Sequence, residues 1–474
     1  MHAPAFISTN EIVPIKKKSR FCDFLIIASP NTHKPELKIK IPKVPTIVYL
    51  LIIFYYIKSN LFKFKFMSTE IWFFIITGLV IFNYLFSNIL DYINHKNWKD
   101  DIPNELKDFY EKEKYKKAKD YSISKNKIGF LSSTISFLLV FSLLVFNGYG
   151  IINDLVSSFE SSYIKSGLFF LTLFLINTLI SLPFSYYNTF VIEEKFGFNK
   201  TTKTTFFLDI IKSSVLSILI GGALLFLALY LYDKINQGFW LWLWIGLSIL
   251  MIFINMFYAD LIVPIFNKLT PLEDGELRNK IEDYSKKVGY LLKNIYVIDG
   301  SKRSTKANAF FSGLGPRKTI ALYDTLIEKH TENELVAVLA HEVGHFKKKH
   351  IFSGLVFSII QIGIMTFFFE LCLSLPEISL ALGGSDISFH LGLIGFSIVF
   401  SPISMLSGIL MNYISRKNEF EADAYAKQTF NGEDLALALK KLSVDSLSNI
   451  YPHPLYVFFH YSHPPLIKRL RALN

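Results

Sequence analysis

The sequence predicts an α-helical, polytopic membrane protein in which seven transmembrane helices are interrupted by one polar insert. Two observations lead to this fold class. Of the 474 residues, 51% are hydrophobic, which is too apolar for an ordinary soluble chain of this length. The apolar residues also gather into long runs, whereas Lys and Arg collect in the segments between them.

The apolar runs give the positions of the helices. A transmembrane helix needs about 20 apolar residues to cross about 30 Å of hydrocarbon. Seven runs meet this requirement: Ile71–Leu90, Gly129–Phe146, Gly167–Tyr186, Phe206–Tyr232, Phe239–Phe266, Ile351–Leu373 and Leu391–Tyr413. The charged segment 267–350 lies between the fifth and sixth runs, so we expect a polar insert there.

The basic residues of the loops indicate the orientation, because short cytoplasmic loops carry an excess of Lys and Arg. The connection 91–128 contains ten lysines, whereas the loop 374–390 contains no Lys or Arg. The insert and the C-terminus are therefore predicted to face the cytoplasm, across a bacterial inner membrane or an endoplasmic reticulum membrane. The net charge of +11 is explained by this topology and requires no nucleic-acid partner; membrane lipids are the expected surroundings.

The first 66 residues do not fit this alternation. They contain eleven Lys or Arg, and their apolar run 44–57 is short for a span. They form a targeting segment, an eighth helix or a translated leader before a start at Met67, and we favour the leader. The predicted organisation is a leader at 1–66, helices one to five at 67–266, a cytoplasmic insert at 267–350, helices six and seven at 351–413, and a cytoplasmic C-terminal part at 414–474.

The segment His341-Glu342-Val343-Gly344-His345 carries the chemistry of the insert. The preceding segment 331–334, Thr-Glu-Asn-Glu, has the form of a capping box and predicts a helix start. On that helix His341 and His345 lie about 40° apart on one face. Two imidazoles one turn apart can hold one zinc ion, with Glu342 as the general base of a metallopeptidase. Two polar residues that merely solvate a helix are the alternative.

A third ligand is expected from a carboxylate on another helix. After the last apolar run, Glu419 and Asp423 are four residues apart and share a helix face, whereas Glu421 points elsewhere. Glu419 is the predicted zinc ligand. Asp423 is predicted to bond the second nitrogen of a ligand histidine and fix its tautomer. Only Cys22 and Cys372 occur, so a thiolate site is not expected.

A β-hairpin is predicted inside the insert. The segments 307–311 and 319–323 flank the turn sequence Gly-Leu-Gly-Pro at 313–316. The open edge of such a hairpin offers main-chain hydrogen bonds to an extended peptide. Asn308 at its start is either a substrate-binding residue or an ordinary turn residue.

From about Met67 to the C-terminus, the chain resembles the type I CAAX prenyl endopeptidases, zinc proteases that trim prenylated proteins. The resemblance rests on five motifs: HEVGH at 341–345, EFEADAYA at 419–426, NTFVIEEKFGFNKTT at 188–202, KRSTKANAFFSG at 302–313 and SHPPLIKRL at 462–470. The zinc motif is shared by many metalloproteases, whereas VIEEKFGFNKTT is far more specific.

The resemblance implies a fold, a cofactor and residue roles. The seven helices would surround a large hydrated chamber, with the site on its cytoplasmic side and one Zn²⁺ per chain. The ligands would be His341, His345 and Glu419, and Glu342 would be the base. Asn308 and Ala309 would bind the substrate backbone, and His463 would stabilise the oxyanion or orient the site. Without the resemblance, His463 and Arg469 would be taken as structural residues.

Two other functions remain open at this point. One is a quality-control metalloprotease of the membrane that shares the zinc motifs but needs no prenyl group on its peptide or protein substrate. The other is a transporter or receptor with an incidental zinc motif. Such proteins usually carry ionisable residues within their spans, and these are few here: Asp209, Lys212, Asp260 and Glu370.

Overall fold

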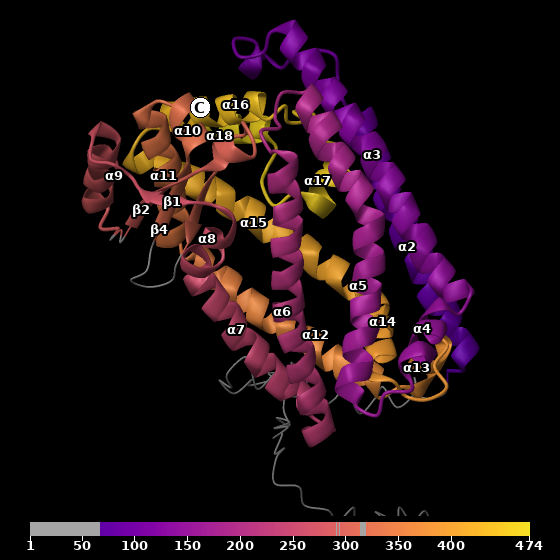
Figure 1. The fold of residues 1–474 in the computed structure, drawn as a ribbon. Coiled ribbons are helices and arrows are strands. Elements are labelled where there is room, and N and C mark those ends of the chain that lie inside the picture. Colours follow the sequence, from indigo (N-terminus) through magenta and orange to yellow (C-terminus); the bar gives the residue numbers. More distant parts are fainter. Residues whose placement is uncertain (1–66, 291, 293, 313–318) are drawn as a thin grey trace, which may run out of the picture. The chain divides into compact units, whose positions relative to one another are not determined.

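A computed structural model of the protein describes residues 67–474 except 291, 293 and 313–318 (Figure 1). The predicted leader, residues 1–66, lies outside this described part. Within it, long helices run beside one another, and a small β-sheet lies near one end of these helices. The fold class expected from the sequence is therefore confirmed.

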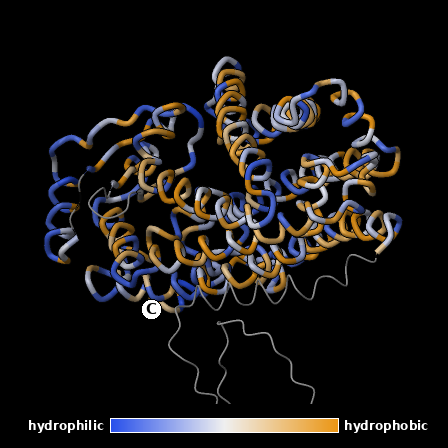
Figure 2. Tube along the Cα trace, turned by 90° about the horizontal axis from the view of Figure 1, so that it is seen from below, coloured by the Kyte–Doolittle hydropathy of each residue, from blue (hydrophilic) through white to orange (hydrophobic). Residues whose placement is uncertain are grey.

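Six helices of the described part are long and apolar enough to cross a membrane. Many of their outward side chains are apolar, and Phe74, for example, is 71% exposed. Figure 2 shows hydrophobic residues along these helices, an arrangement that suits contact with lipid. The helices are α2 (Thr69–Lys96), α3 (Lys112–Val145), α5 (Ser162–Tyr187), α6 (Lys203–Ile235), α7 (Phe239–Leu261) and α12 (His350–Leu373).

The seventh predicted span is divided into two helices. Helix α14 (Phe389–Val399) meets α15 (Ser401–Thr429) at a bend of 48°. Pro402 stands in the first turn of α15, where its missing N–H would break a continuous helix. Counted as one bent span, the pair gives seven spans among the described residues, as predicted.

The fifth span covers Phe239–Phe266, as the apolar run predicted, but it is divided into two helices. Helix α7 stops at Leu261, and the short helix α8 (Val263–Phe266) follows with Pro264 near its start. At the opposite end of the spans, two short helices occupy connections expected to be loops. They are α4 (Gly148–Val156) and α13 (Pro376–Ala381), and their buried residues belong to the apolar cluster of the long helices.

The sheet contains the predicted hairpin and two further strands. Its order is β1-β2-β4-β3, with β3 (Ala309–Ser312) and β4 (Thr319–Tyr323) antiparallel. Strand β2 (Asn294–Ile298) pairs parallel to β4, and β1 (Leu269–Pro271) covers the far edge. The order makes β3 an edge strand, so one side of it is not paired with another described strand.

Helix α11 (Glu332–Lys347) starts at the predicted cap, where the side chain of Thr331 accepts a hydrogen bond from the backbone N–H of Glu334 at 3.3 Å. It packs closely on α15: a Cβ atom added to Gly344 would lie 3.0 Å from Cα of Ala422. The glycine of the zinc motif thus allows the two helices that carry its residues to approach.

The remaining helices complete the part of the molecule around the sheet and α11. They are α9 (Glu276–Lys287), α10 (Asp324–Lys329), α16 (Gly432–Asp445), α17 (Pro454–His460) and α18 (Leu466–Leu473), with short turns of other helical types at Asn104–Leu106, Asn188–Glu193 and Gly300–Lys302.

Candidate metal centre and active site

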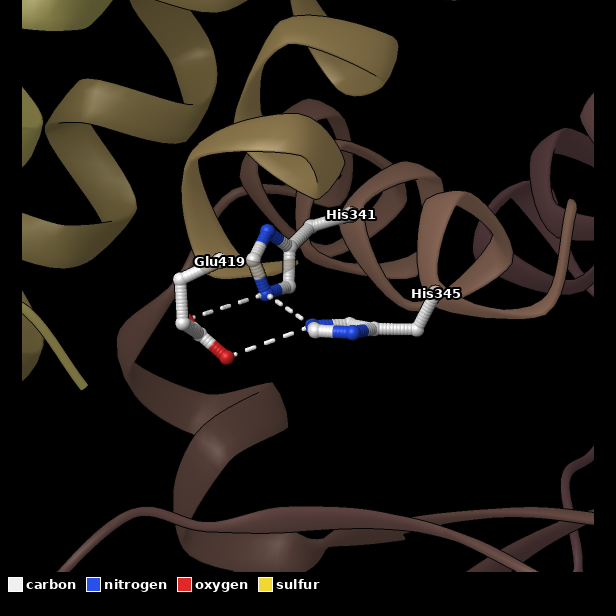
Figure 3. A group of neighbouring side chains, drawn as sticks. All are labelled: His341, His345 and Glu419. Carbon is white, nitrogen blue, oxygen red and sulfur yellow. Dashed lines mark hydrogen bonds and ion pairs between the residues drawn. The ribbon is translucent and has the colours of Figure 1, made fainter. Parts of the chain in front are cut away.

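Helices α11 and α15 bring His341, His345 and Glu419 together (Figure 3). The Nε2 atoms of the two histidines lie 3.2 Å apart. Oε1 of Glu419 lies 3.2 Å from Nε2 of His345, and Oε2 of Glu419 lies 3.6 Å from Nε2 of His341. The two Nε2 atoms and the two carboxylate oxygens of Glu419 therefore converge on one place, with neighbouring atoms 3.2 to 3.6 Å apart.

These spacings fit a zinc ion. Zinc held tetrahedrally at about 2.0–2.1 Å places neighbouring ligand atoms roughly 3.3 Å apart. The buried Oε2 atom of Glu419 also makes no hydrogen bond to another described residue, although Nη1 of Arg469 lies 3.1 Å away as an ion partner. A buried carboxylate oxygen without a hydrogen bond keeps a free lone pair, and a bound cation would use that lone pair beside the guanidinium of Arg469.

The second nitrogen of His341 contacts a buried ion pair. Oδ1 of Asp423 lies 2.8 Å from Nδ1 of His341. Arg469 on α18 donates to both carboxylate oxygens of Asp423, at 2.8 and 2.6 Å. Burial disfavours the charged form of Arg469, but the bonds to Asp423 outweigh it and raise the pKa of the guanidinium. Arg469 thus stays charged and holds Asp423 against His341.

Glu342 lies beside the donor atoms without joining them. Its side chain is partly exposed, whereas His341 is buried. Burial disfavours protonation of His345, but a hydrogen bond with Glu419 and the charges of Glu342 and Glu419 outweigh it and raise the pKa of this imidazole. Burial and the charge of Glu342 raise the pKa of Tyr290 to about 12. The charge of Glu342 therefore affects both His345 and Tyr290.

His463 reaches the same carboxylate from the loop before α18. Its Nε2 atom lies 3.4 Å from Oε1 of Glu419, and the hydroxyl of Ser462 contacts its Nδ1 atom at 2.9 Å. The side chain is 64% exposed, so most of the ring is free to meet another molecule.

The edge strand presents main-chain groups close to its start. The carbonyl of Asn308 accepts a bond from the N–H of Tyr323 in β4 at 3.1 Å, so the backbone groups of Ala309 and Phe311 turn to the other, unpaired side. The side chain of Asn308 accepts a bond from the N–H of Ala309 at 2.9 Å. The amide of Asn308 therefore sits at the beginning of the open edge.

The segment before β3 is tied to residues of the membrane helices. Arg303 makes two bonds to Asp209 of α6, at 2.7 and 2.9 Å. The ammonium of Lys306 bonds Glu193 at 3.0 Å and the hydroxyl of Tyr121 at 2.8 Å. The motif VIEEKFGFNKTT supplies Glu193 and thus helps to fix the edge strand.

A pocket of about 560 Å³ lies beside this strand. It is lined mainly by aromatic and aliphatic side chains from α7, β3 and the region where α11 meets α12. Among them are Tyr258, Tyr290, Phe310 and Phe346, and Asn308 also lines the pocket. Phe346, which follows His345 directly in the sequence, lines the pocket, so the pocket lies close to the motif.

Two contacts of the site were not predicted from the sequence. The second nitrogen of His345 contacts His350, and His350 in turn contacts Glu421. The helix-face argument was sufficient to separate Glu421 from Glu419 and Asp423. It did not anticipate that a histidine between them would link Glu421 to a predicted ligand.

Comparison with known proteins identifies the family. Residues 91–268 match the family described as "CAAX prenyl protease N-terminal, five membrane helices", and residues 271–474 match "Peptidase family M48". A CAAX prenyl protease 1 of Saccharomyces cerevisiae is 35% identical over 434 residues, which cover 85% of this chain and 95% of the yeast protein. The chain belongs to the CAAX prenyl protease family of M48 peptidases.

Other members of the CAAX prenyl protease family give the same result. The human CAAX prenyl protease 1 homologue is 32% identical over 420 residues, covering 79% of this chain and 88% of the human protein. The crystal structure of Ste24p from S. mikatae matches with a TM-score of 0.80 at 34% identity, covering 85% of this chain and 99% of the other. As a member of this family, the chain is a multi-pass membrane metalloendopeptidase, and the transporter or receptor alternative is excluded.

Proposed function

We propose that this protein is a zinc endopeptidase that removes the C-terminal tripeptide from prenylated CAAX proteins. The observation that carries the proposal is the convergence of donor atoms from His341, His345 and Glu419, which lie 3.2 to 3.6 Å from their neighbours, with Glu342 next to His341 in the sequence. The names of the relatives supply the substrate class, because they are CAAX prenyl proteases.

The proposed roles follow from the positions of the side chains. Zinc would be held by His341, His345 and Glu419, and when bound it lowers the pKa of a water molecule and polarises a carbonyl group. Glu342 then accepts a proton from the attacking water and delivers it to the leaving amine. The exposed ring of His463 donates a hydrogen bond from Nε2 to the oxyanion that forms on the scissile carbonyl.

The substrate is proposed to bind as an additional strand on the open edge of β3. The carbonyl of Ala309 and the backbone groups of Phe311 would pair with an extended peptide. The side-chain amide of Asn308, whose oxygen accepts a bond from the N–H of Ala309, would bind the peptide backbone at the end of this pairing. The pocket beside β3 is lined by aromatic rings, which suits apolar substrate side chains near the cleaved bond.

The proposed location is a membrane whose cytoplasmic side carries the site, in agreement with the basic loops. Under this proposal the long apolar helices contact lipid, and residues 267–350 and 414–474 form the cytoplasmic part. Labelling Ser446→Cys and Ser385→Cys in intact membranes tests the orientation. A maleimide that cannot cross the membrane should modify Ser385→Cys when it is applied to the non-cytoplasmic face. Modification of Ser446→Cys under the same conditions would contradict it.

Cleavage of a matched pair of peptides tests the function. The purified protein should cleave a farnesylated CAAX peptide after the modified cysteine and release the tripeptide, and o-phenanthroline should stop the reaction. Glu342→Gln, purified in parallel, controls for contaminating peptidases. Equal cleavage of the same peptide without the farnesyl group would favour the quality-control alternative. No cleavage of either peptide by protein that contains zinc would contradict the proposed reaction.

A further inference from the structure

A chain of three side chains leads away from His345 on the side opposite to the metal donors. Nδ1 of His345 lies 3.1 Å from Nδ1 of His350, and Nε2 of His350 lies 3.1 Å from Oε2 of Glu421. The three residues belong to α11, α12 and α15. The side chain of His350 is only 8% exposed, whereas that of Glu421 is 41% exposed.

Hydrogen-bond chemistry gives this chain one direction. When Nε2 of His345 serves as a ligand it offers a lone pair, so the proton of the neutral ring must reside on Nδ1. That proton is donated to Nδ1 of His350, which must then be an acceptor. The proton of His350 consequently lies on Nε2 and is donated to the carboxylate of Glu421. Each nitrogen and oxygen atom in this series is thus either a donor or an acceptor, and the assignments are mutually consistent.

The backbone between the two helices produces this contact. In a continuous helix, residues five apart are separated by about 140°, so His345 and His350 would point apart. Helix α11 instead ends after Lys347, and Lys349 adopts a left-handed conformation with φ 62°. This turn brings His350, the first residue of α12, back against His345, and their ring centroids lie 5.2 Å apart.

We propose that His350 and Glu421 are positioning residues that fix the tautomer and orientation of His345 as a metal ligand. The inference rests on the proposed metal site, and it assigns to His350 and Glu421 a function in metal affinity. Outer partners of ligand histidines commonly contribute about 10- to 100-fold to metal affinity. His350 touches the ligand directly and is buried, so its contribution exceeds that of Glu421.

Zinc affinity, measured by chelator competition on the purified full chain, tests the proposal without reference to turnover. His350→Ala should weaken zinc binding by about 10- to 100-fold, and Glu421→Ala should weaken it by roughly tenfold or less. His350→Asn should recover part of the loss, because its side-chain oxygen can accept the proton of His345. In the His350→Ala background, Glu421→Ala should have no further effect, because the link to His345 is already broken.

Two matched variants separate positioning from folding. His330 forms another buried histidine–glutamate contact, 2.9 Å from Glu334, which lies about two turns before His341 on α11. His330→Ala should leave zinc affinity unchanged. Lys417 lies 3.7 Å from Glu421 on the same helix, and Lys417→Ala should also be neutral. The visible spectrum of the Co²⁺-substituted protein should change in His350→Ala and not in either control.

The outcomes distinguish the inference from the proposed function. Zinc binding by His350→Ala that equals wild type would overturn the inference and leave the metal site intact. An equal loss of affinity in His330→Ala and His350→Ala would also overturn it, because the effect would then come from folding. Failure of the wild-type protein to bind zinc would overturn both.

Discussion

The two histidines of the proposed metal centre lie one turn apart on the same helix, but their Nδ1 atoms have different surroundings. His341 contacts Asp423, which Arg469 holds in a buried ion pair. His345 contacts His350, whose partner Glu421 is half-exposed. Charged side chains in the interior thus hold His341, whereas the neutral ring of His350, whose partner Glu421 is half-exposed, holds His345.

The largest effect is expected at Glu419, which lies close to both His341 and His345. Glu419 approaches His345 at 3.2 Å and His341 at 3.6 Å, so it is the one proposed ligand that both sides share. Glu419→Ala should lose zinc and peptidase activity together. Metal analysis and peptide cleavage on the same preparation check this. Full zinc content in Glu419→Ala would show that the two histidines hold the metal without the carboxylate of Glu419.

Substitution of Glu342 should affect the cleavage rate without affecting zinc binding. It follows His341 directly and its charge acts on His345, but its carboxylate is not among the converging donor atoms. Glu342→Ala should therefore keep its zinc and lose nearly all turnover, because the proton of the attacking water has no acceptor. The measurement is zinc content beside cleavage rate. Loss of zinc in this variant would place Glu342 among the ligands.

Asp423 should matter more than Glu421. Asp423→Ala should weaken zinc binding by about 10- to 100-fold, as expected for the partner of a ligand histidine. It should also destabilise the protein by about 3–5 kcal/mol, because Arg469 would be left as a buried charge without its main partner. Glu421→Ala leaves no such charge in the interior.

Thermal unfolding in detergent, combined with chelator competition, tests this difference between Asp423→Ala and Glu421→Ala. The double variant Asp423→Ala/Arg469→Ala is the control, since it removes the stranded charge and should recover stability but not zinc affinity. Equal stability of Asp423→Ala and Glu421→Ala would contradict the comparison.

The sequence was sufficient to predict the partner of His341 but not that of His345. The spacing of Glu419 and Asp423 on a helix, like that of His341 and His345, follows from 3.6 residues per turn, and these side chains do meet. His350 could not be found in this way, because its position depends on the left-handed conformation of Lys349, which interrupts the periodicity.

The same limit applies to the fold. Apolar runs predicted where the spans lie, since their length is set by the membrane. They did not predict the bend before Pro402 or the break at Pro264, where one residue changes the hydrogen bonding within an apolar run. Strands β1 and β2 were missed because α9 separates them in the sequence, so no short turn marks them as a pair, and their pairing is decided by contacts with β4 or with each other.

The smallest effect is expected at the His330–Glu334 contact beside α11, which resembles the His350–Glu421 contact but lies away from the metal donors. Burial lowers the pKa of His330 despite the neighbouring carboxylate. Its Nε2 atom is buried and has no hydrogen-bond partner among the described residues, which fits a neutral ring. Protonation would place an N–H group there without an acceptor.

The sign of the pH dependence follows from that lowered pKa. The unfolded chain takes up a proton near pH 6.5, whereas the folded chain does so only at lower pH, so this histidine's contribution to stability is present above pH 6.5 and is lost as pH falls. Burial raises the pKa of Glu334, but bonds from Lys441 and His330 lower it overall, and its contribution is lost only below about pH 4.5. Between pH 7 and 5, the loss of thermal stability should therefore be smaller in His330→Gln than in wild type. Zinc affinity of the two proteins at pH 7 should be equal, because no contact joins His330 to the ligands. An unchanged pH dependence in His330→Gln would contradict the lowered pKa of His330. A larger loss in His330→Gln than in wild type would mean that the ring already carries its proton at neutral pH, and that this buried histidine–glutamate contact behaves as an ion pair.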